Sequence, residues 1–201
     1  ETRALLIDTR AAAFFAKGFV PNSINFGLDG HFAMWIGEMV TDIKQPILLV
    51  TEPGKEEETV IRLSRVGYDN TIGYLEGGFD AWRKAGKDVD TVQRIDADEF
   101  AKRMTSGKLP VFDVRKKSEF DSEHVEGVEN IPLNVINEHL AEFPKDRPFI
   151  LHCQGGYRSM VAASILKQRG WNDFVDVEGG FTAMKNTDVK RTEYVCPTTL
   201  L

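Results

Sequence analysis

The chain has 201 residues, of which 28% are charged and 42% hydrophobic, and its formal net charge is −6. An acidic balance of this kind offers no basic face to nucleic acid or to anionic lipid. The longest apolar runs, such as residues 46–50, are far shorter than the roughly 20 residues that cross a bilayer. We therefore expect a cytoplasmic protein that binds neither nucleic acid nor membrane.

The sequence contains only two cysteines, Cys153 and Cys196. Two cysteines are too few for a disulfide framework, and the sequence lacks the cluster of Cys and His residues that a zinc site needs. We therefore expect no metal site in this chain. A reducing compartment, with one thiol kept for chemistry, fits this cysteine usage best.

Several segments recur with a period of roughly 100 residues, which is too long for a solenoid repeat. Asp8-Thr9-Arg10 returns as Asp113-Val114-Arg115, and Glu76-Gly77-Gly78-Phe79 returns as Glu178-Gly179-Gly180-Phe181. The chain therefore contains two copies of one domain, which we place at residues 1–90 and 91–201. The polar stretch 87–94 is the expected linker.

Each copy alternates short apolar runs with helical patterns, which predicts an α/β fold with a mainly parallel sheet flanked by helices. The expected strands include 47–50, 71–75, 149–152 and 174–177, and the expected helices include 60–66, 96–104 and 160–169. The helix at 96–104 leads into the second copy, whereas the first copy begins without such a lead-in. This asymmetry suggests that the chain is a fragment of a longer protein.

The clearest candidate site follows the run 149–152. It consists of Cys153 and the residues after it, Gln154, Gly155, Gly156, Tyr157, Arg158 and Ser159. Two adjacent glycines let such a loop curl with its N–H groups pointing inward. A helix N-terminus directly after the loop adds to this anion-binding environment. The sequence therefore predicts a nucleophilic thiolate at Cys153, with residues 154–159 forming its cradle and binding the substrate.

The pattern Cys-x-x-Gly-x-Arg-Ser, placed between a buried strand and a helix, resembles the active-site loop of the rhodanese family. Further segments resemble the same family: Asp113-Val114-Arg115, Glu119 with His124 and Gly127, Asn130-Ile131-Pro132, and Glu178-Gly179-Gly180-Phe181. The resemblance implies two rhodanese-like domains and transfer of sulfane sulfur. A donor such as thiosulfate or a low-molecular-weight persulfide would load Cys153, and the persulfide would pass its sulfur to a thiol or another thiophilic acceptor, without a cofactor in this fragment.

Two other functions are considered for this loop. Cysteine phosphatases and some arsenate reductases use a similar cradle with one more residue between Cys and Arg, and the shorter spacing from Cys153 to Arg158 favours a single sulfur over a tetrahedral oxyanion. A domain of this kind can also serve as a docking or regulatory module without turnover. Arg158 either anchors the loop or contacts the negative charge of the donor. Gln154 and Tyr157 are expected to influence acceptor choice.

Other polar residues near the motif are expected to be structural. The side chain of His152 points away from the nucleophile, because successive side chains of a strand alternate between faces, and this predicts a satisfied core histidine. Asp113 and Arg115 are expected to form an ion pair that holds the loops. His124 is interpreted as a turn or packing residue. Cys196 lies in a polar tail without a glycine cradle and is expected not to be catalytic.

The first copy has Thr51 at the position of Cys153, followed by Pro53 and by glutamates at 56–58. It contains no thiol, so its expected role is structural or a docking role. The apolar stretch 32–40 is interpreted as a helix of its core. A degenerate copy before an active one resembles the C-terminal half of bacterial fusions in which a metallo-β-lactamase-fold domain precedes tandem rhodanese domains. The resemblance implies an upstream fused domain, a metal-dependent hydrolase or persulfide dioxygenase, to which any metal would belong.

Overall fold

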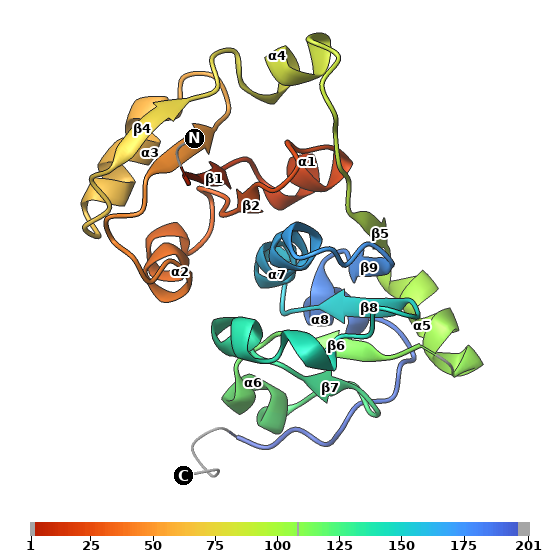
Figure 1. Ribbon diagram of the computed structural model, residues 1–201. Helices are drawn as coiled ribbons and strands as arrows, with labels where there is room; N and C mark the ends of the chain where they lie inside the picture. The colour runs from red at the N-terminus through yellow and green to blue at the C-terminus, as the bar shows by residue number, and fades with distance from the viewer. Residues whose placement is uncertain (1–2, 108, 197–201) are drawn as a thin grey trace. The chain divides into compact units, whose positions relative to one another are not determined.

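The computed structural model describes residues 3–107 and 109–196, and the chain divides into two compact units, Glu1–Thr91 and Val92–Leu201. Each unit is an α/β domain in which every pair of neighbouring strands is parallel (Figure 1). The predicted fold class is therefore confirmed. Within the described residues, no helix has both the length and the apolar character needed to cross a membrane.

The first unit contains a four-stranded sheet in the order β2-β1-β3-β4. Its strands are β1 (Leu5–Asp8), β2 (Ile24–Asn25), β3 (Ile47–Val50) and β4 (Thr71–Tyr74). Its helices are α1 (Ala12–Lys17), α2 (Phe32–Met39), α3 (Glu56–Ser64) and α4 (Gly78–Lys84). Phe32, Trp35 and Ile36 of α2 are buried, so the apolar stretch at 32–40 does supply core residues as predicted.

The second unit contains a five-stranded sheet in the order β5-β9-β8-β6-β7. Its strands are β5 (Gln93–Ile95), β6 (Val111–Asp113), β7 (Glu129–Asn130), β8 (Phe149–His152) and β9 (Phe174–Val177). Its α-helices are α5 (Ala97–Ser106), α6 (Lys117–Ser122), α7 (Tyr157–Gln168) and α8 (Gly180–Met184), with short 3-10 helices at Leu133–Glu138 and Leu140–Glu142. All four residues of β8 are buried, which explains the apolar run in the sequence at this strand.

The segment expected to be the linker is partly structured. Gln93 and Arg94 belong to β5, which pairs with β9 through the contacts Gln93↔Val175 and Arg94↔Asp176. Polar side chains hide this strand from a sequence reading, because β5 lies at the edge of the sheet, where a strand tolerates exposure. The helix α7 also begins earlier than predicted, at Tyr157, directly after the glycines of the cysteine loop.

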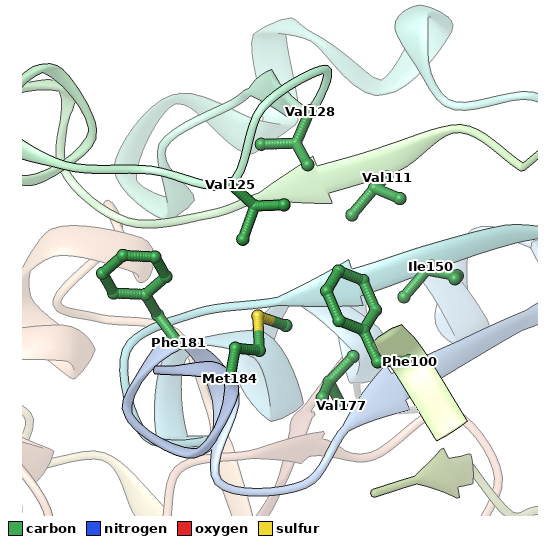
Figure 2. Packing of buried hydrophobic residues seen from close by; sticks show 8 residues of the cluster. All are labelled: Phe100, Val111, Val125, Val128, Ile150, Val177, Phe181 and Met184. Atoms are coloured by element: carbon green, nitrogen blue, oxygen red, sulfur yellow. The ribbon is translucent and has the colours of Figure 1, made fainter. Parts of the chain in front are cut away.

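One core cluster of the second unit lies where α5 and α8 pack against the sheet (Figure 2). Figure 2 shows Phe100 from α5 and Phe181 and Met184 from α8 turned toward valine and isoleucine side chains of the strands and loops. Phe100, Phe181 and Met184 have at most 1% of their surface exposed. Burial of such side chains contributes roughly 1.5–3 kcal/mol each. This packing fixes α8 against the end of β8, where the cysteine loop begins.

The N-terminus of α8 approaches the cysteine loop so closely that only glycine fits at the contact. A Cβ atom at Gly180 would lie 2.3 Å from the carbonyl oxygen of Cys153, and the φ angle of Gly180 is +53°. With no side chain in the way, Phe181 N–H donates to the carbonyl of Cys153 at 2.7 Å, and Thr182 N–H donates to that of Gln154 at 3.0 Å. The glycine pair of the repeated motif therefore secures the first two residues of the loop.

We predict that Gly180→Ala lowers the free energy of unfolding by roughly 2–4 kcal/mol, because the added methyl group collides with backbone at a strained φ. Urea denaturation measures this change. Gly155→Ala is the matched control, since a Cβ at Gly155 meets nothing within 4 Å. The control should change stability by about 0.5 kcal/mol or less. Equal losses in the two variants would contradict the steric explanation.

Candidate active site

Cys153 is the residue directly after β8, and its side chain is completely buried. Gly156, with a φ angle of +100°, turns the chain into α7 and donates its N–H to Cys153 Sγ at 3.1 Å. The sulfur thus lies beside the N-terminus of a 12-residue helix. Both the amide and the helix dipole favour a negatively charged sulfur. This geometry suits a thiolate nucleophile and, equally, an anionic persulfide.

Arg158 lies in the first turn of α7 and forms a two-pronged ion pair with Glu119 of α6. Its Nη2 donates to Glu119 Oε1 at 2.9 Å, and its Nη1 donates to Oε2. Burial disfavours the charge of Arg158, but the hydrogen bond and charge of Glu119, together with a negative Cys153, raise its pKa overall. Likewise, burial disfavours the charge of Glu119, but the bonds and charge of Arg158 outweigh it and lower the pKa of Glu119. Arg158 is therefore anchored while its charge still acts on the sulfur.

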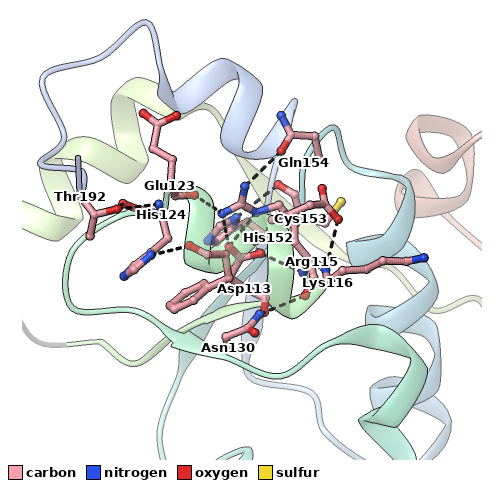
Figure 3. Close-up of polar contacts among 12 residues, drawn as sticks. Asp113, Arg115, Lys116, Glu123, His124, Asn130, His152, Cys153, Gln154 and Thr192 are labelled. Atoms are coloured by element: carbon pink, nitrogen blue, oxygen red, sulfur yellow. Dashed lines mark hydrogen bonds and ion pairs between the residues drawn. The ribbon is translucent and has the colours of Figure 1, made fainter. Parts of the chain in front are cut away.

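Gln154 links the loop to two neighbouring segments. Its side-chain oxygen accepts a hydrogen bond from Arg115 Nη1 at 3.2 Å (Figure 3). Its Nε2 donates to Thr182 Oγ1 at 2.9 Å. Gly155 is open on its Cβ side, and Tyr157 is partly buried as the first residue of α7. The structure thus places the seven residues 153–159 in one loop and helix turn, while Gln154 has a structural link that the sequence did not reveal.

A buried polar frame supports the loop from below (Figure 3). Arg115 donates its backbone N–H and its Nε to Asp113 at 2.9 and 2.8 Å. Asn130 Nδ2 donates to the carbonyls of both residues, at 2.8 and 3.0 Å. The guanidinium of Arg115 lies over the ring of Phe181, 4.0 Å from its centre. Asp113 and Arg115 therefore do form the expected ion pair.

The first unit contains the same frame without the thiol. Arg10 forms an ion pair with Asp8 at 2.6 Å, and Asn25 Nδ2 donates to the carbonyls of both. The guanidinium of Arg10 lies 4.3 Å from the ring centre of Phe79. Because a unit that has lost the cysteine retains these contacts, we interpret the frame as a means of holding the loops rather than as part of the chemistry.

The ion pair of Arg158, in contrast, is absent from the first unit together with the thiol. Counted from Thr51, Glu56 stands where Arg158 stands in the second unit, and counted from Arg10, Phe14 stands where Glu119 does. Phe14 is 57% exposed. Both partners have thus been replaced along with the cysteine, which ties the Arg158–Glu119 pair to the sulfur site.

The two histidines near the site do not face the sulfur as bases. His152 is fully buried; its Nδ1 lies 3.3 Å from the carbonyl oxygen of Cys153, and its Nε2 has no hydrogen-bond partner in the described part of the chain. Burial lowers the pKa of His152, so the ring is neutral, and it is less fully satisfied than the sequence suggested. His124 Nδ1 forms a hydrogen bond with the carbonyl of Phe120 at 2.7 Å, and the His124 ring stacks on the Phe120 ring. Both contacts fit a packing residue. Cys196 is exposed in the tail, and neither cysteine is part of a disulfide.

A second buried ion pair lies close to the loop and was missed in the sequence. Asp176 of β9 is completely buried and accepts a hydrogen bond from Arg94 Nε of β5 at 3.0 Å. Burial raises the pKa of Asp176 to about 6, although the hydroxyl of Ser159 and the charge of Arg94 oppose the shift; Glu178 adds to it. The one signal in the sequence was a carboxylate inside the apolar run 174–177.

We predict that Asp176→Asn stabilises the protein at neutral pH by roughly 1–3 kcal/mol. The folded-state pKa lies above the ordinary value of 3.8, so the ionised carboxylate destabilises the fold above about pH 6, and this penalty fades as the pH falls toward 4. Arg94 retains Glu178 as a partner at 3.0 Å, which limits the loss from removing the Asp176 charge. Urea unfolding at several pH values measures the difference. A variant that is less stable at about pH 7.5, or a gain independent of pH, would contradict this account.

Comparison with known proteins bears on both units. A family model described as "Rhodanese-like domain" matches residues 1–85 and 96–187. The chain is 41% identical over 78 residues to a probable adenylyltransferase/sulfurtransferase, MoeZ, of Mycobacterium tuberculosis, covering 38% of this chain and 20% of that protein. It is 34% identical over 86 residues to the thiosulfate sulfurtransferase GlpE of Shewanella oneidensis, covering 40% of this chain and 81% of that protein. A crystal structure of a thiosulfate sulfurtransferase from Pseudomonas aeruginosa covers 96% of this chain and 41% of its own, with 19% identity and a TM-score of 0.46.

The family model matches well over half of the chain, in two separate stretches that correspond to the two sheets. The two relatives compared by sequence match shorter regions, 38% and 40% of this chain, and the chain spans only a fifth of the mycobacterial protein. The match to the family model shows that the chain belongs to the rhodanese-like domain family and contains two of its domains.

Proposed function

We propose that the second unit is a sulfurtransferase that carries sulfane sulfur as a persulfide on Cys153. The observation that carries the proposal is the sulfur of Cys153 beside the Gly156 amide, 3.1 Å away, at the N-terminus of α7. Both the thiolate before loading and the persulfide after it are anions, and the same amide and helix dipole favour each of them. The sulfurtransferase names of related proteins support the same reaction class.

The first half-reaction loads the cysteine. The Cys153 thiolate attacks the outer sulfur of thiosulfate, the sulfur–sulfur bond of the donor breaks, and sulfite leaves with the bonding electron pair. A low-molecular-weight persulfide would react in the same way and release its thiolate. Arg158, anchored by Glu119, provides positive charge near the sulfur, and this charge offsets the repulsion between the anionic thiolate and the anionic donor.

The second half-reaction unloads the cysteine. A thiophilic acceptor, a thiolate in the cell or cyanide in an assay, attacks the outer sulfur of the persulfide and regenerates the Cys153 thiolate. No electrons are gained or lost overall, because one sulfur atom moves from donor to acceptor. The carrier is the cysteine sulfur itself, so the proposed reaction asks for no further cofactor.

The first unit has no part in this chemistry in our proposal. Thr51 replaces the cysteine, and Glu52 and Pro53 follow it in the loop. A pocket of about 220 Å³ remains at the corresponding place, lined in part by Phe14, Pro53 and Phe79. The unit keeps the polar frame and loses the nucleophile. The suggested docking role of this unit, and an upstream metallo-β-lactamase-fold domain fused to the chain, stay predictions.

We predict that the protein converts thiosulfate and cyanide to thiocyanate and sulfite, and that Cys153→Ser abolishes this turnover because the carrier atom is lost. Colorimetric detection of thiocyanate measures the rate. Cys196→Ser is the matched control and should keep its rate within about twofold, since Cys196 lies in the exposed tail. Turnover that survives Cys153→Ser, or release of phosphate from an aryl phosphate in the absence of thiocyanate formation, would contradict the proposed function.

A further inference from the structure

The buried ion pair of Asp176 and Arg94 lies directly beneath the sulfur loop. Asp176 is paired in register with Leu151 of β8, and Cys153 follows at the end of that strand. The residue is enclosed by the sheet and by α7, which packs against both β8 and β9. Asp176 therefore occupies the floor of the site, between the strand that bears the nucleophile and the helix that faces it.

The guanidinium group of Arg94 in β5 meets two other segments of the site, the C-terminal end of β9 and the turn at Gly156. Its Nε bonds Asp176 at 3.0 Å, and its Nη1 bonds Glu178 at 3.0 Å. Its Nη2 lies 3.4 Å from the point where a Cβ atom of Gly156 would stand. Arg94 thus lies beside the turn whose amide donates to Cys153 Sγ, and its Nε is bonded to Asp176.

Ser159 of the helix α7 also lies near the Asp176–Arg94 ion pair. Its hydroxyl is buried, and it lies close enough to Asp176 to lower the pKa of that carboxyl. Neither Ser159 Oγ nor Asp176 Oδ1 forms a hydrogen bond of normal geometry within the described residues. The hydrogen bond that holds the Asp176 carboxylate is therefore the one from Arg94 to its Oδ2.

The fold itself does not require this arrangement. Tyr74 stands at the position of Asp176 relative to the glycine pair of the first unit, and Glu57 stands at the position of Ser159. The first unit forms its sheet and its polar frame without either residue. A buried ion pair between a β9 carboxylate and Arg94, present only in the unit with the thiol, indicates a role in the site.

We propose that Asp176 is a positioning residue of the sulfur site: through Arg94 it holds the Gly156 turn, at the start of α7, in the arrangement that directs the Gly156 N–H at Cys153 Sγ. The proposal rests on the proposed function and names the group that keeps its cradle in place. The charge of Asp176 matters because a neutral side chain would hold the guanidinium of Arg94 less firmly. The charged or polar groups that face it are Arg94 from β5, Ser159 from α7 and Glu178 from the end of β9.

Asp176→Asn tests this role in a Cys196→Ser background, where Cys153 is the sole thiol. Two rates are measured for each variant: alkylation of Cys153 by iodoacetamide, and thiocyanate formation from thiosulfate and cyanide. A displacement of about 1 Å in a reacting group can slow a reaction roughly 100-fold. We expect both rates to fall about tenfold at about pH 7.5, with the KM for thiosulfate changed less than about twofold.

The pH dependence separates a role of the charge from a merely structural one. Protonated Asp176 resembles asparagine, so the ratio of the parent rate to the Asp176→Asn rate should approach one as the pH falls through about 6 to about 5. Effects of pH on the thiol itself occur in both proteins and cancel in this ratio. A ratio that does not change with pH would overturn the proposal.

Two further variants complete the test. Arg94→Gln should slow both rates to a similar degree, and the double variant should be no slower than the slower single one, because both act through one contact. Glu178→Gln removes the exposed partner of Arg94 and should leave both rates within about twofold. Equal effects of Glu178→Gln and Asp176→Asn would overturn the proposal. If the parent forms no thiocyanate but Asp176→Asn still slows alkylation of Cys153, only the proposed function is refuted. If the parent and Asp176→Asn form thiocyanate at equal rates, only the positioning role is refuted.

Discussion

The carbonyl oxygen of Cys153 leaves no space for a side chain at position 180, where a Cβ atom would lie 2.3 Å away. This contact allows the N-terminus of α8 to donate two N–H groups to the start of the cysteine loop. The loop in turn directs the Gly156 amide at the sulfur. The same constraint exists in the first unit, where a Cβ at Gly78 would lie 2.8 Å from the carbonyl of Thr51. The close approach of the helix to this loop is thus a property of the fold, because it occurs both with the cysteine and without it.

Comparison of the two units distinguishes the contacts that hold the loops from the residues that belong to the sulfur site. Both contain the Asp–Arg–Asn frame with an aromatic ring under the arginine. Only the second contains Cys153, the Arg158–Glu119 pair and the buried Asp176. Features shared by a copy with the cysteine and a copy without it explain how the loops are held. Features confined to the copy with the cysteine point to the proposed reaction, and the buried ion pair of Asp176 and Arg94 is one of them.

The fold and the nucleophile could be predicted from the sequence because each leaves a local signal. Alternating apolar runs and helical patterns indicate parallel sheets, and the glycines after Cys153 indicate a curled loop. The contacts of the loop's partners leave no such signal, since Glu119 and Arg94 meet the site only after the chain has folded. The strand β5 was missed for a related reason: its polar residues resemble a linker until Arg94 is seen to pair with Asp176. Contacts between residues far apart in the sequence depend on register, which composition does not encode.

The central claim is that one sulfur atom per chain is held on Cys153. Mass spectrometry of the intact protein after incubation with thiosulfate and removal of excess donor tests it most directly. The account predicts a single added sulfur atom, located by digestion on the peptide that contains Cys153 and lost after treatment with cyanide. An unchanged mass with thiosulfate and with a low-molecular-weight persulfide, or an added sulfur found on Cys196, would contradict it.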